Sequence, residues 1–197
     1  MTPEIEVKFA NVDHESVRKK LIAAGARLVQ PMRLMRRVVF HNQTLKEKNA
    51  FIRVRDEGNR VTVTYKQFDA ISVDGAKEIE TVIDDFDIAV ALLEQTGLSN
   101  DAYQETRRET WLLNGVEVVL DEWPWVPTYI EIEAKTEEEV RSAAELLGFD
   151  WSRALFGGVA SIYMLEYPTV GDEMPEIINH KVGKIRFQDP VPTLFLR

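Results

Sequence analysis

The stretch EIEVKF at residues 4–9 decides the fold, because similar stretches recur as EIETVI at residues 78–83 and YIEIEA at residues 129–134. In each stretch charged and aliphatic residues alternate. A period of two is typical of a β-strand, whose successive side chains point to opposite faces of the sheet. Each strand would therefore carry two carboxylates on one face, and these repel each other unless a cation lies between them. We interpret the three pairs as parts of one site for a shared cation, most simply a divalent metal.

A segment typical of a helix follows each of these three strands. A capping box formed by Thr136 and Glu139 marks the start of the third helix, and a glycine follows the end of each. The helices are expected at residues 13–24, 85–96 and 137–147.

Further alternating segments predict the remaining strands. The dipeptide Asn114-Gly115 indicates a tight hairpin, because it suits the positive φ angles of a two-residue turn. We expect an α+β fold of about eight mostly antiparallel strands and three helices. Its other elements are expected as strands near residues 27–30 and 36–41, a turn at 44–49, and a hairpin of residues 50–56 with 59–68.

The charged strand faces have two alternative placements. In the commoner one they face water and the aliphatic faces form the core. A solvated face usually mixes Thr, Ser, Lys and Gln, whereas here glutamate pairs and basic pairs such as Arg53 and Arg55 occupy separate strands. This favours an eight-stranded antiparallel β-barrel with a charged lumen and helices packed on the outside. An acidic sector would hold cations and a basic sector a polyanion, as a metal-chelated polyphosphate requires.

Composition limits the class of protein. The chain has 197 residues, of which 45% are hydrophobic, and no cysteine, so disulfides and thiolate metal sites are ruled out. The net charge of -9 argues against general nucleic-acid binding but not against a small anionic ligand. Neither a signal peptide nor an apolar run long enough to span a bilayer is evident, so we expect a cytoplasmic protein.

The character of the sequence changes after Tyr167. Residues 168–197 contain four prolines among short apolar segments, whereas a disordered tail would hold fewer apolar residues. We therefore divide the chain into a domain at residues 1–167 and a C-terminal extension at 168–197 that wraps around this domain or a second subunit. No P-loop or Rossmann motif occurs, and three scattered histidines do not predict a zinc site.

An ordered set of motifs resembles the CYTH superfamily, the triphosphate tunnel metalloenzymes. The residues EIEVK, IRVR, YK, EIE, RR, LDEW and EIE appear in that family's order across residues 4–167. The resemblance implies an eight-stranded antiparallel tunnel that binds a triphosphate with Mg²⁺ or Mn²⁺. Class IV adenylyl cyclases, thiamine triphosphatases and inorganic triphosphatases belong to this family.

The resemblance also implies roles for individual residues. The metal ligands would be Glu4, Glu6, Asp121, Glu131 and Glu133. The catalytic residues that grip phosphate oxygens would be Lys8, Arg53, Arg55, Lys66 and Arg108, and Glu78 and Glu80 would line the substrate site. Some positions depart from the family pattern: Thr106 replaces a lysine, the segment after Asp121 lacks a glycine-rich turn, and a C-terminal Ser-Tyr pair is interrupted as Ser161-Ile162-Tyr163.

We therefore expect a metal-dependent enzyme that hydrolyses a phosphoanhydride of tripolyphosphate, a nucleoside triphosphate or thiamine triphosphate. One alternative is a class IV adenylyl cyclase that makes cyclic AMP and pyrophosphate from ATP. A second is a non-catalytic module that binds polyphosphate or nucleotide. The expected partner is a small triphosphate, with no nucleic acid and no membrane, and a homodimer is compatible with the sequence.

Three finer expectations follow from the alternation. Arg108 should point into the lumen and Arg107 outward, because neighbouring strand residues face opposite sides. Glu131→Gln should leave the metal-free protein at least as stable, since it relieves like-charge repulsion. Trp123 and Trp125 are expected to pack in a core or interface, although stacking on a base or thiazole is the alternative.

Overall fold

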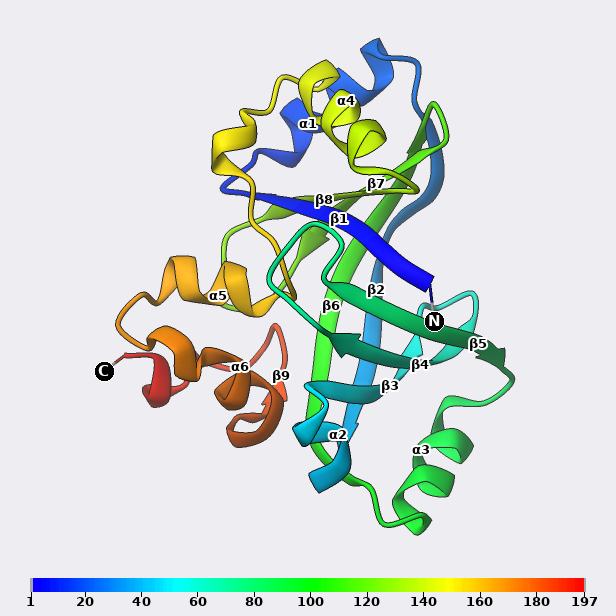
Figure 1. Ribbon diagram of the computed structural model, residues 1–197, viewed down its shortest axis with the longest axis vertical. Helices are drawn as coiled ribbons and strands as arrows, with labels where there is room; N and C mark the ends of the chain where they lie inside the picture. Colours follow the sequence, from blue (N-terminus) through cyan, green and yellow to red (C-terminus); the bar gives the residue numbers. More distant parts are fainter. Residues whose placement is uncertain (1, 197) are drawn as a thin grey trace.

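The computed structural model describes residues 2–196, apart from the side chains of residues 2–4 and 101. Eight antiparallel strands follow one another around a sheet in the order β2-β3-β4-β5-β1-β8-β7-β6, and pairing of β2 with β6 joins its two ends (Figure 1). The strands are β1 (Thr2–Ala10), β2 (Arg27–His41), β3 (Ala50–Asp56), β4 (Val61–Phe68), β5 (Ala76–Ile83), β6 (Ser99–Leu113), β7 (Val116–Glu122) and β8 (Tyr129–Ala134). The eight-stranded antiparallel barrel predicted from the sequence is confirmed.

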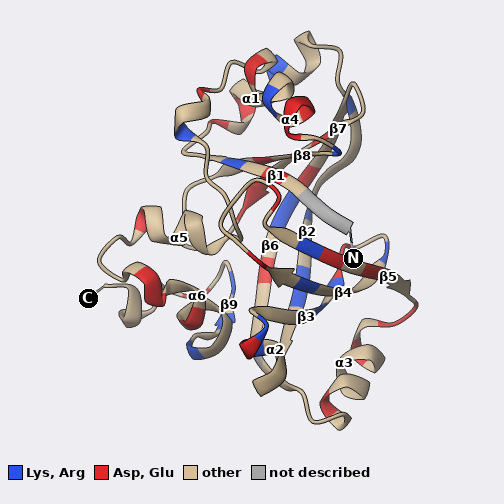
Figure 2. Cartoon of the chain, in the orientation of Figure 1, with Lys and Arg blue, Asp and Glu red and all other residues tan. Residues whose placement is uncertain are grey.

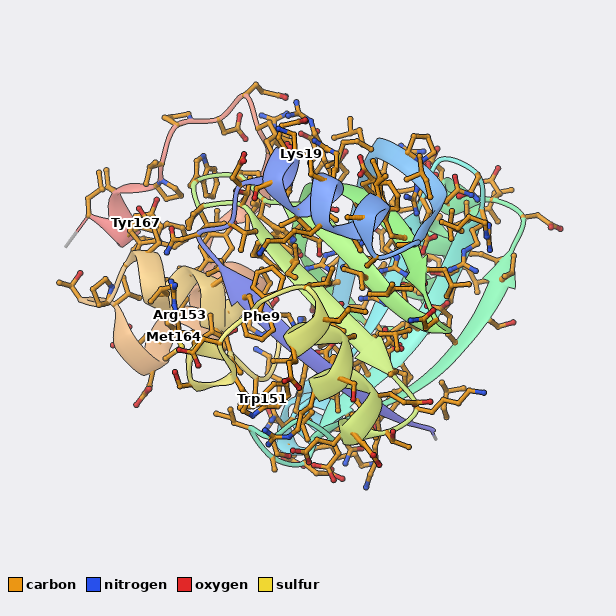
Figure 3. The ribbon with its side chains drawn as sticks, turned by 90° about the horizontal axis from the view of Figure 1, so that it is seen from above. Phe9, Lys19, Trp151, Arg153, Met164 and Tyr167 are labelled. Carbon is orange, nitrogen blue, oxygen red and sulfur yellow. The ribbon has the colours of Figure 1, made fainter. Side chains whose placement is uncertain are left out.

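The hydrophobic core lies outside the barrel, between its strands and the helices. Helices α1 (His14–Ala23) and α4 (Glu137–Leu146) cover β1, β7 and β8, and α3 (Phe86–Gln95) covers β2 and β3. Phe9, on the outer face of β1, stacks on Phe149 with ring centroids 4.8 Å apart and meets the edge of Trp151 on this helical side (Figure 3). The aliphatic faces of β1, β7 and β8 are therefore buried under helices, and the charged faces of these strands line the lumen. On β5 the aliphatic face stays uncovered, since Ile79 is 58% exposed.

Two local predictions differ from the structure. Residues 27–41 form one strand instead of two, and Pro31, which has no N–H to donate, lies where the pairing of β2 with β6 shifts between Gln30 and Arg33. The turn expected at residues 44–49 is replaced by a short helix, α2 (Gln43–Glu47). The side chain of Asn42 caps it by accepting a hydrogen bond from the Leu45 N–H at 2.8 Å.

The C-terminal part of the chain packs against the barrel. Its elements are α5 (Ala160–Glu166), α6 (Met174–Glu176), a π-helical turn at Ile177–Lys181, strand β9 (Gly183–Ile185), and 3-10 turns at Trp151–Arg153, Gly171–Glu173 and Thr193–Phe195. Strand β9 pairs in parallel with β6 at residues 102–104. Met174, Ile178 and Phe195 are buried in one cluster with Trp123 and Tyr163. The extension thus shares a core with its own barrel, and the division at residue 167 stays a prediction.

No helix in the described part of the chain is long and apolar enough to cross a membrane.

Candidate functional site

The lumen of the barrel holds a cavity of about 1050 Å³ whose lining is rich in charged side chains. Acidic and basic residues lie along the barrel strands (Figure 2). We call one side the basic wall, formed on β2–β4 by Arg37, Arg53, Arg55 and Lys66. We call the other side the acidic wall, formed on β1, β7 and β8 by Glu6, Glu117, Asp121, Glu131 and Glu133.

The basic wall keeps donor groups that have no partner among the described residues. Arg53 donates from Nη2 to Thr64 Oγ1 at 3.2 Å, and Arg55 Nη2 lies 2.5 Å from Glu57 Oε1. The Nε atoms of both arginines and the hydroxyl of Thr62 are buried and form no hydrogen bond with the described residues. Burial and then the nearby guanidinium of Arg53 lower the pKa of Arg55 to about 10. This wall therefore has positive charge and N–H groups left over for an anion.

Lysine 8 joins the acidic wall to a loop. Its Nζ donates to Glu6 Oε1 at 2.9 Å and to the Gly157 carbonyl at 2.8 Å, and it lies 3.0 Å from Glu131 Oε2. Burial alone would lower the pKa of Lys8, but Glu131 and Glu6 outweigh it and raise the pKa. Since three protein oxygens take its three N–H groups, Lys8 would have to release one of them to contact a phosphate.

Arg108 points into the lumen and Arg107 points outward. Arg108 forms a bidentate pair with Asp121, at 2.7 Å and 2.6 Å, and lies 3.5 Å from Glu131. Arg107 instead pairs with Glu122 at 3.2 Å and stacks over Phe187 in the extension. The orientation predicted from the alternation is present, and Arg108 enters the lumen already neutralised by carboxylates.

A row of three carboxylates crosses the acidic wall. Glu133 on β8 lies directly opposite Glu6 on β1 and directly opposite Glu117 on β7. Directly opposed side chains on neighbouring strands have Cβ atoms roughly 5 Å apart, so like charges there destabilise the sheet. Burial and then the charges of Glu131, Glu117 and Glu6 raise the pKa of Glu133 to about 7. The row is therefore short of positive charge.

Glu131, two residues away on the same face, is in the opposite situation. Burial would raise its pKa, but Lys8 and Arg108 together lower it below its usual range. The sequence-based expectation that Glu131→Gln would not destabilise the metal-free protein assumed an unpaired carboxylate. That premise is wrong, because Glu131 is a structural partner of both cations.

The glutamates of β5 face the basic wall. Glu78 lies 3.0 Å from Lys66, and Glu80 accepts a hydrogen bond from Thr64 at 2.7 Å and lies 3.7 Å from Arg53. Both therefore line the cavity, as predicted, and they hold basic side chains in place.

The oxygen-rich acidic wall fits a hard divalent cation in its chemistry. Glutamate and aspartate oxygens are the ligands that Mg²⁺ and Mn²⁺ prefer. In the row of Glu6, Glu133 and Glu117, only Glu6 is paired with a cation among the described residues. Within the described residues, no three such side chains are already placed as ligands of one ion. The predicted ligand Glu4 lies outside the described side chains. A cation would therefore bind with rearrangement of the ion pairs of Lys8 and Arg108.

The C-terminal extension contacts residues of the barrel that are distant from it in the sequence. The rings of His41 and His180, on β2 and in the extension, lie 4.0 Å apart. Trp123 packs against Tyr163 and Trp125 against Phe195, so both tryptophans belong to the core shared with the extension, the favoured reading. Thr106, where the family pattern has lysine, is buried and adds no charge.

The sequence analysis missed several residues that line the cavity, among them Arg37, Arg60 and Glu117. Glu117 lies four residues before Asp121 on strand β7. Because residues an even number apart on a strand share a face, the sequence already indicated that both point to the same side. Arg37 had no comparable signal, because its importance depends on Gln104 and Trp123, which are far away in the sequence.

The family comparison agrees with this geometry. The CYTH domain model matches residues 2–150. The chain belongs to the CYTH domain family. The resemblance predicted from the ordered motifs is thus confirmed, and residues 151–197 lie beyond the matched region.

Solved structures of the same fold come from several organisms. The PH1012 protein of Pyrococcus horikoshii OT3 is 24% identical, with a TM-score of 0.66 over 77% of this chain and 93% of that one. A candidate adenylate cyclase from Vibrio parahaemolyticus is 14% identical, with a TM-score of 0.71 over 82% and 97%. HpAC1 from Hippeastrum, described as having a dominant triphosphatase activity, is 16% identical, with a TM-score of 0.53 over 79% and 91%. At these identities the likeness is one of fold. No match was found among curated proteins.

Proposed function

We propose that this CYTH protein is a divalent-metal-dependent triphosphatase that hydrolyses a phosphoanhydride bond of a small triphosphate. The observation that carries the proposal is that one side of the cavity lacks negative charge and the other side lacks positive charge. On the basic wall, the buried Nε–H groups of Arg53 and Arg55 have no partner among the described residues. On the acidic wall, only Glu6 of the three carboxylates in the row is paired with a described cation. A metal-chelated polyphosphate supplies both the missing anion and the missing cation.

The chain's own residues would bind and orient the substrate. Arg53 and Arg55 would donate to non-bridging phosphate oxygens and offset the negative charge that develops as the phosphoanhydride bond breaks. Because Glu57 and Glu80 already hold the ends of these guanidinium groups, the arginines are oriented before substrate arrives. Glu6, Glu131 and Glu133 would hold the metal. When bound, such a cation lowers the pKa of a coordinated water and neutralises phosphate charge.

A class IV adenylyl cyclase activity is the second candidate, and the likeness in fold to the Vibrio parahaemolyticus protein favours it. In that reaction the ribose 3′-hydroxyl attacks the α-phosphate and pyrophosphate leaves. A non-catalytic binding module is the third candidate, favoured by the uncharged Thr106 in place of a lysine.

Product analysis separates the three candidates. The purified protein would be incubated with tripolyphosphate, ATP or thiamine triphosphate in the presence of Mg²⁺ or Mn²⁺, and the products separated by ion-exchange chromatography. Release of orthophosphate supports the hydrolase, and pyrophosphate with cyclic AMP indicates the cyclase. Tight binding without any product indicates the binding module and overturns the proposal.

A further inference from the structure

Arg37 is unusual among the arginines that line the cavity. Arg53, Arg55, Arg60 and Arg108 each pair with a carboxylate, whereas Arg37 forms no ion pair with a described residue. Its side chain is partly exposed to the cavity. Burial and then the nearby charges of Arg53 and Arg55 hold the pKa of Arg37 well below its usual range. A guanidinium in this position lacks a counter-ion.

Two contacts fix the plane and the rotation of this guanidinium. Its Nε donates to Gln104 Oε1 at 2.7 Å, and its central carbon lies 4.2 Å from the ring centroid of Trp123. Neither Nη atom is hydrogen-bonded to a described residue. The contacts therefore occupy Nε and one face, and leave the two Nη groups, with four N–H donors, for a ligand.

Gln104 is oriented by the C-terminal segment. It is fully buried and donates from Nε2 to the carbonyl of Ile178 at 3.1 Å. Because only its amide nitrogen can donate to a carbonyl, its oxygen must face Arg37. Ile178 in turn is held in the core with Trp123 and Met174, and β9 runs beside Gln104 on β6. A contact path thus leads from a segment beyond the family match to a cation in the lumen.

The position of Arg37 identifies the ligand group. Arg37 on β2 lies directly opposite Arg55 on β3, whose Nε is also unpartnered. Two cations at directly opposed positions repel each other unless an anion bridges them. A tetrahedral phosphoryl group has several oxygens and can accept from both guanidinium groups at once.

We propose that Arg37 is an additional phosphate-binding residue, that it grips one phosphoryl group of the substrate together with Arg55, and that Gln104 and the C-terminal segment position it. This inference rests on the proposed function of the cavity. It assigns residues 174–185 to the substrate site and gives Gln104 the role of a positioning residue.

Titration calorimetry with inorganic tripolyphosphate in EDTA tests binding without turnover. We expect Arg37→Ala to weaken binding about 10- to 100-fold, the worth of a hydrogen bond to a charged group. Arg37→Lys should recover part of the loss, since it keeps the charge but not the forked geometry. Arg36→Ala is the matched control, because Arg36 points outward to Asp56 and Phe86, and it should change the dissociation constant by less than about twofold.

Gln104→Leu tests the positioning role. It should weaken binding about 3- to 10-fold, less than Arg37→Ala, because the charge remains but its orientation is lost. Combining it with Arg37→Ala should add nothing, since both act through the same guanidinium. Full additivity of the two changes, or normal binding by Gln104→Leu, would overturn the positioning role.

The outcomes also separate this inference from the proposed function. If the unmodified protein binds none of tripolyphosphate, ATP and thiamine triphosphate, with or without Mg²⁺, both fail. If Arg53→Ala weakens binding but Arg37→Ala behaves like Arg36→Ala, the cavity binds phosphate and the role of Arg37 is wrong. Thermal melting of each variant without ligand verifies folding, and Arg37→Ala should also lose part of the stabilisation that tripolyphosphate gives the unmodified protein.

Discussion

On the acidic wall, Lys8 and Arg108 hold Glu131 and Asp121 in place, whereas on the basic wall Arg37 has no carboxylate partner among the described residues. The acidic wall is thus partly neutralised by its own cations, and its remaining deficit is confined to the row around Glu133. On the basic wall the missing partner is an anion, and the uncompensated positive charge is shared by several guanidinium groups. The difference indicates that the basic wall is preorganised for its anion, whereas the acidic wall must exchange ion pairs to accept a cation.

The largest expected effect comes from removing metal. We expect a chelator to abolish the release of phosphate from tripolyphosphate, because Glu133 and Glu117 have no ion pair among the described residues and Glu6 shares only Lys8. Activity would be measured after stripping with EDTA and again after addition of Mg²⁺ or Mn²⁺. Unchanged circular dichroism of the stripped protein is the control for folding. Full turnover by the stripped protein in excess EDTA would remove the metal from the mechanism.

The next largest effect concerns the basic wall. Arg55→Ala should lower kcat/KM for tripolyphosphate by about 10²–10³, because a preorganised cation beside a developing phosphate charge contributes that much to the rate. The measurement is steady-state kinetics at saturating metal. A loss of less than about fivefold would mean that the basic wall does not contact the reacting phosphate.

The acidic wall offers a matched pair of substitutions two residues apart. Glu131→Gln should lower the free energy of unfolding of the metal-free protein by about 3 kcal/mol, since it leaves the buried charge of Lys8 less compensated. Glu133→Gln should raise that free energy by about 1 kcal/mol, because it removes a carboxylate whose pKa of about 7 reflects repulsion and burial.

Urea unfolding of both variants in EDTA at pH 8 measures this contrast. At that pH the Glu133 carboxylate is ionised, so its unfavourable interactions are present and the substitution relieves them. If both substitutions change the free energy of unfolding equally, the different ion pairing of Glu131 and Glu133 does not affect stability.

The smallest effect is expected at Arg107. Arg107→Ala should change kcat/KM by less than about twofold and stability by roughly 0–1 kcal/mol, because its ion pair with Glu122 is exposed. It is the control for Arg55→Ala, since both substitutions remove one guanidinium from a strand. If Arg107→Ala were the damaged variant, the outward orientation would be misassigned.

The period of two in the sequence was enough to predict which side of each strand faces the lumen. Glu6, Lys8, Arg53, Arg55 and Glu131 line the cavity for the simple reason that alternate residues share a face. The turn between β6 and β7 was equally predictable from the dipeptide Asn114-Gly115, which suits positive φ angles. In the structure the two residues have φ angles of 52° and 90°.

Cross-strand register was not predictable in the same way. The row of Glu6, Glu133 and Glu117 arises only because three strands align at these residues, and no single strand encodes that alignment. The hydrogen bonds of the Lys8 ammonium group include one to the carbonyl of Gly157, which is 149 positions away in the sequence. The short helix α2 was not predicted, because its five residues are too few to show a helical period in the sequence.

The core around Phe195 has a consequence for how the protein is made. Phe195 contacts the rings of Trp125, Tyr163 and Tyr167, and it is 2% exposed. During synthesis the eight barrel strands leave the ribosome well before residue 195 does, so for several seconds this aromatic cluster has no cover. We therefore expect the nascent barrel to pass through a stage with an open apolar surface, in which it is exposed to aggregation and to chaperones until residue 195 has been made.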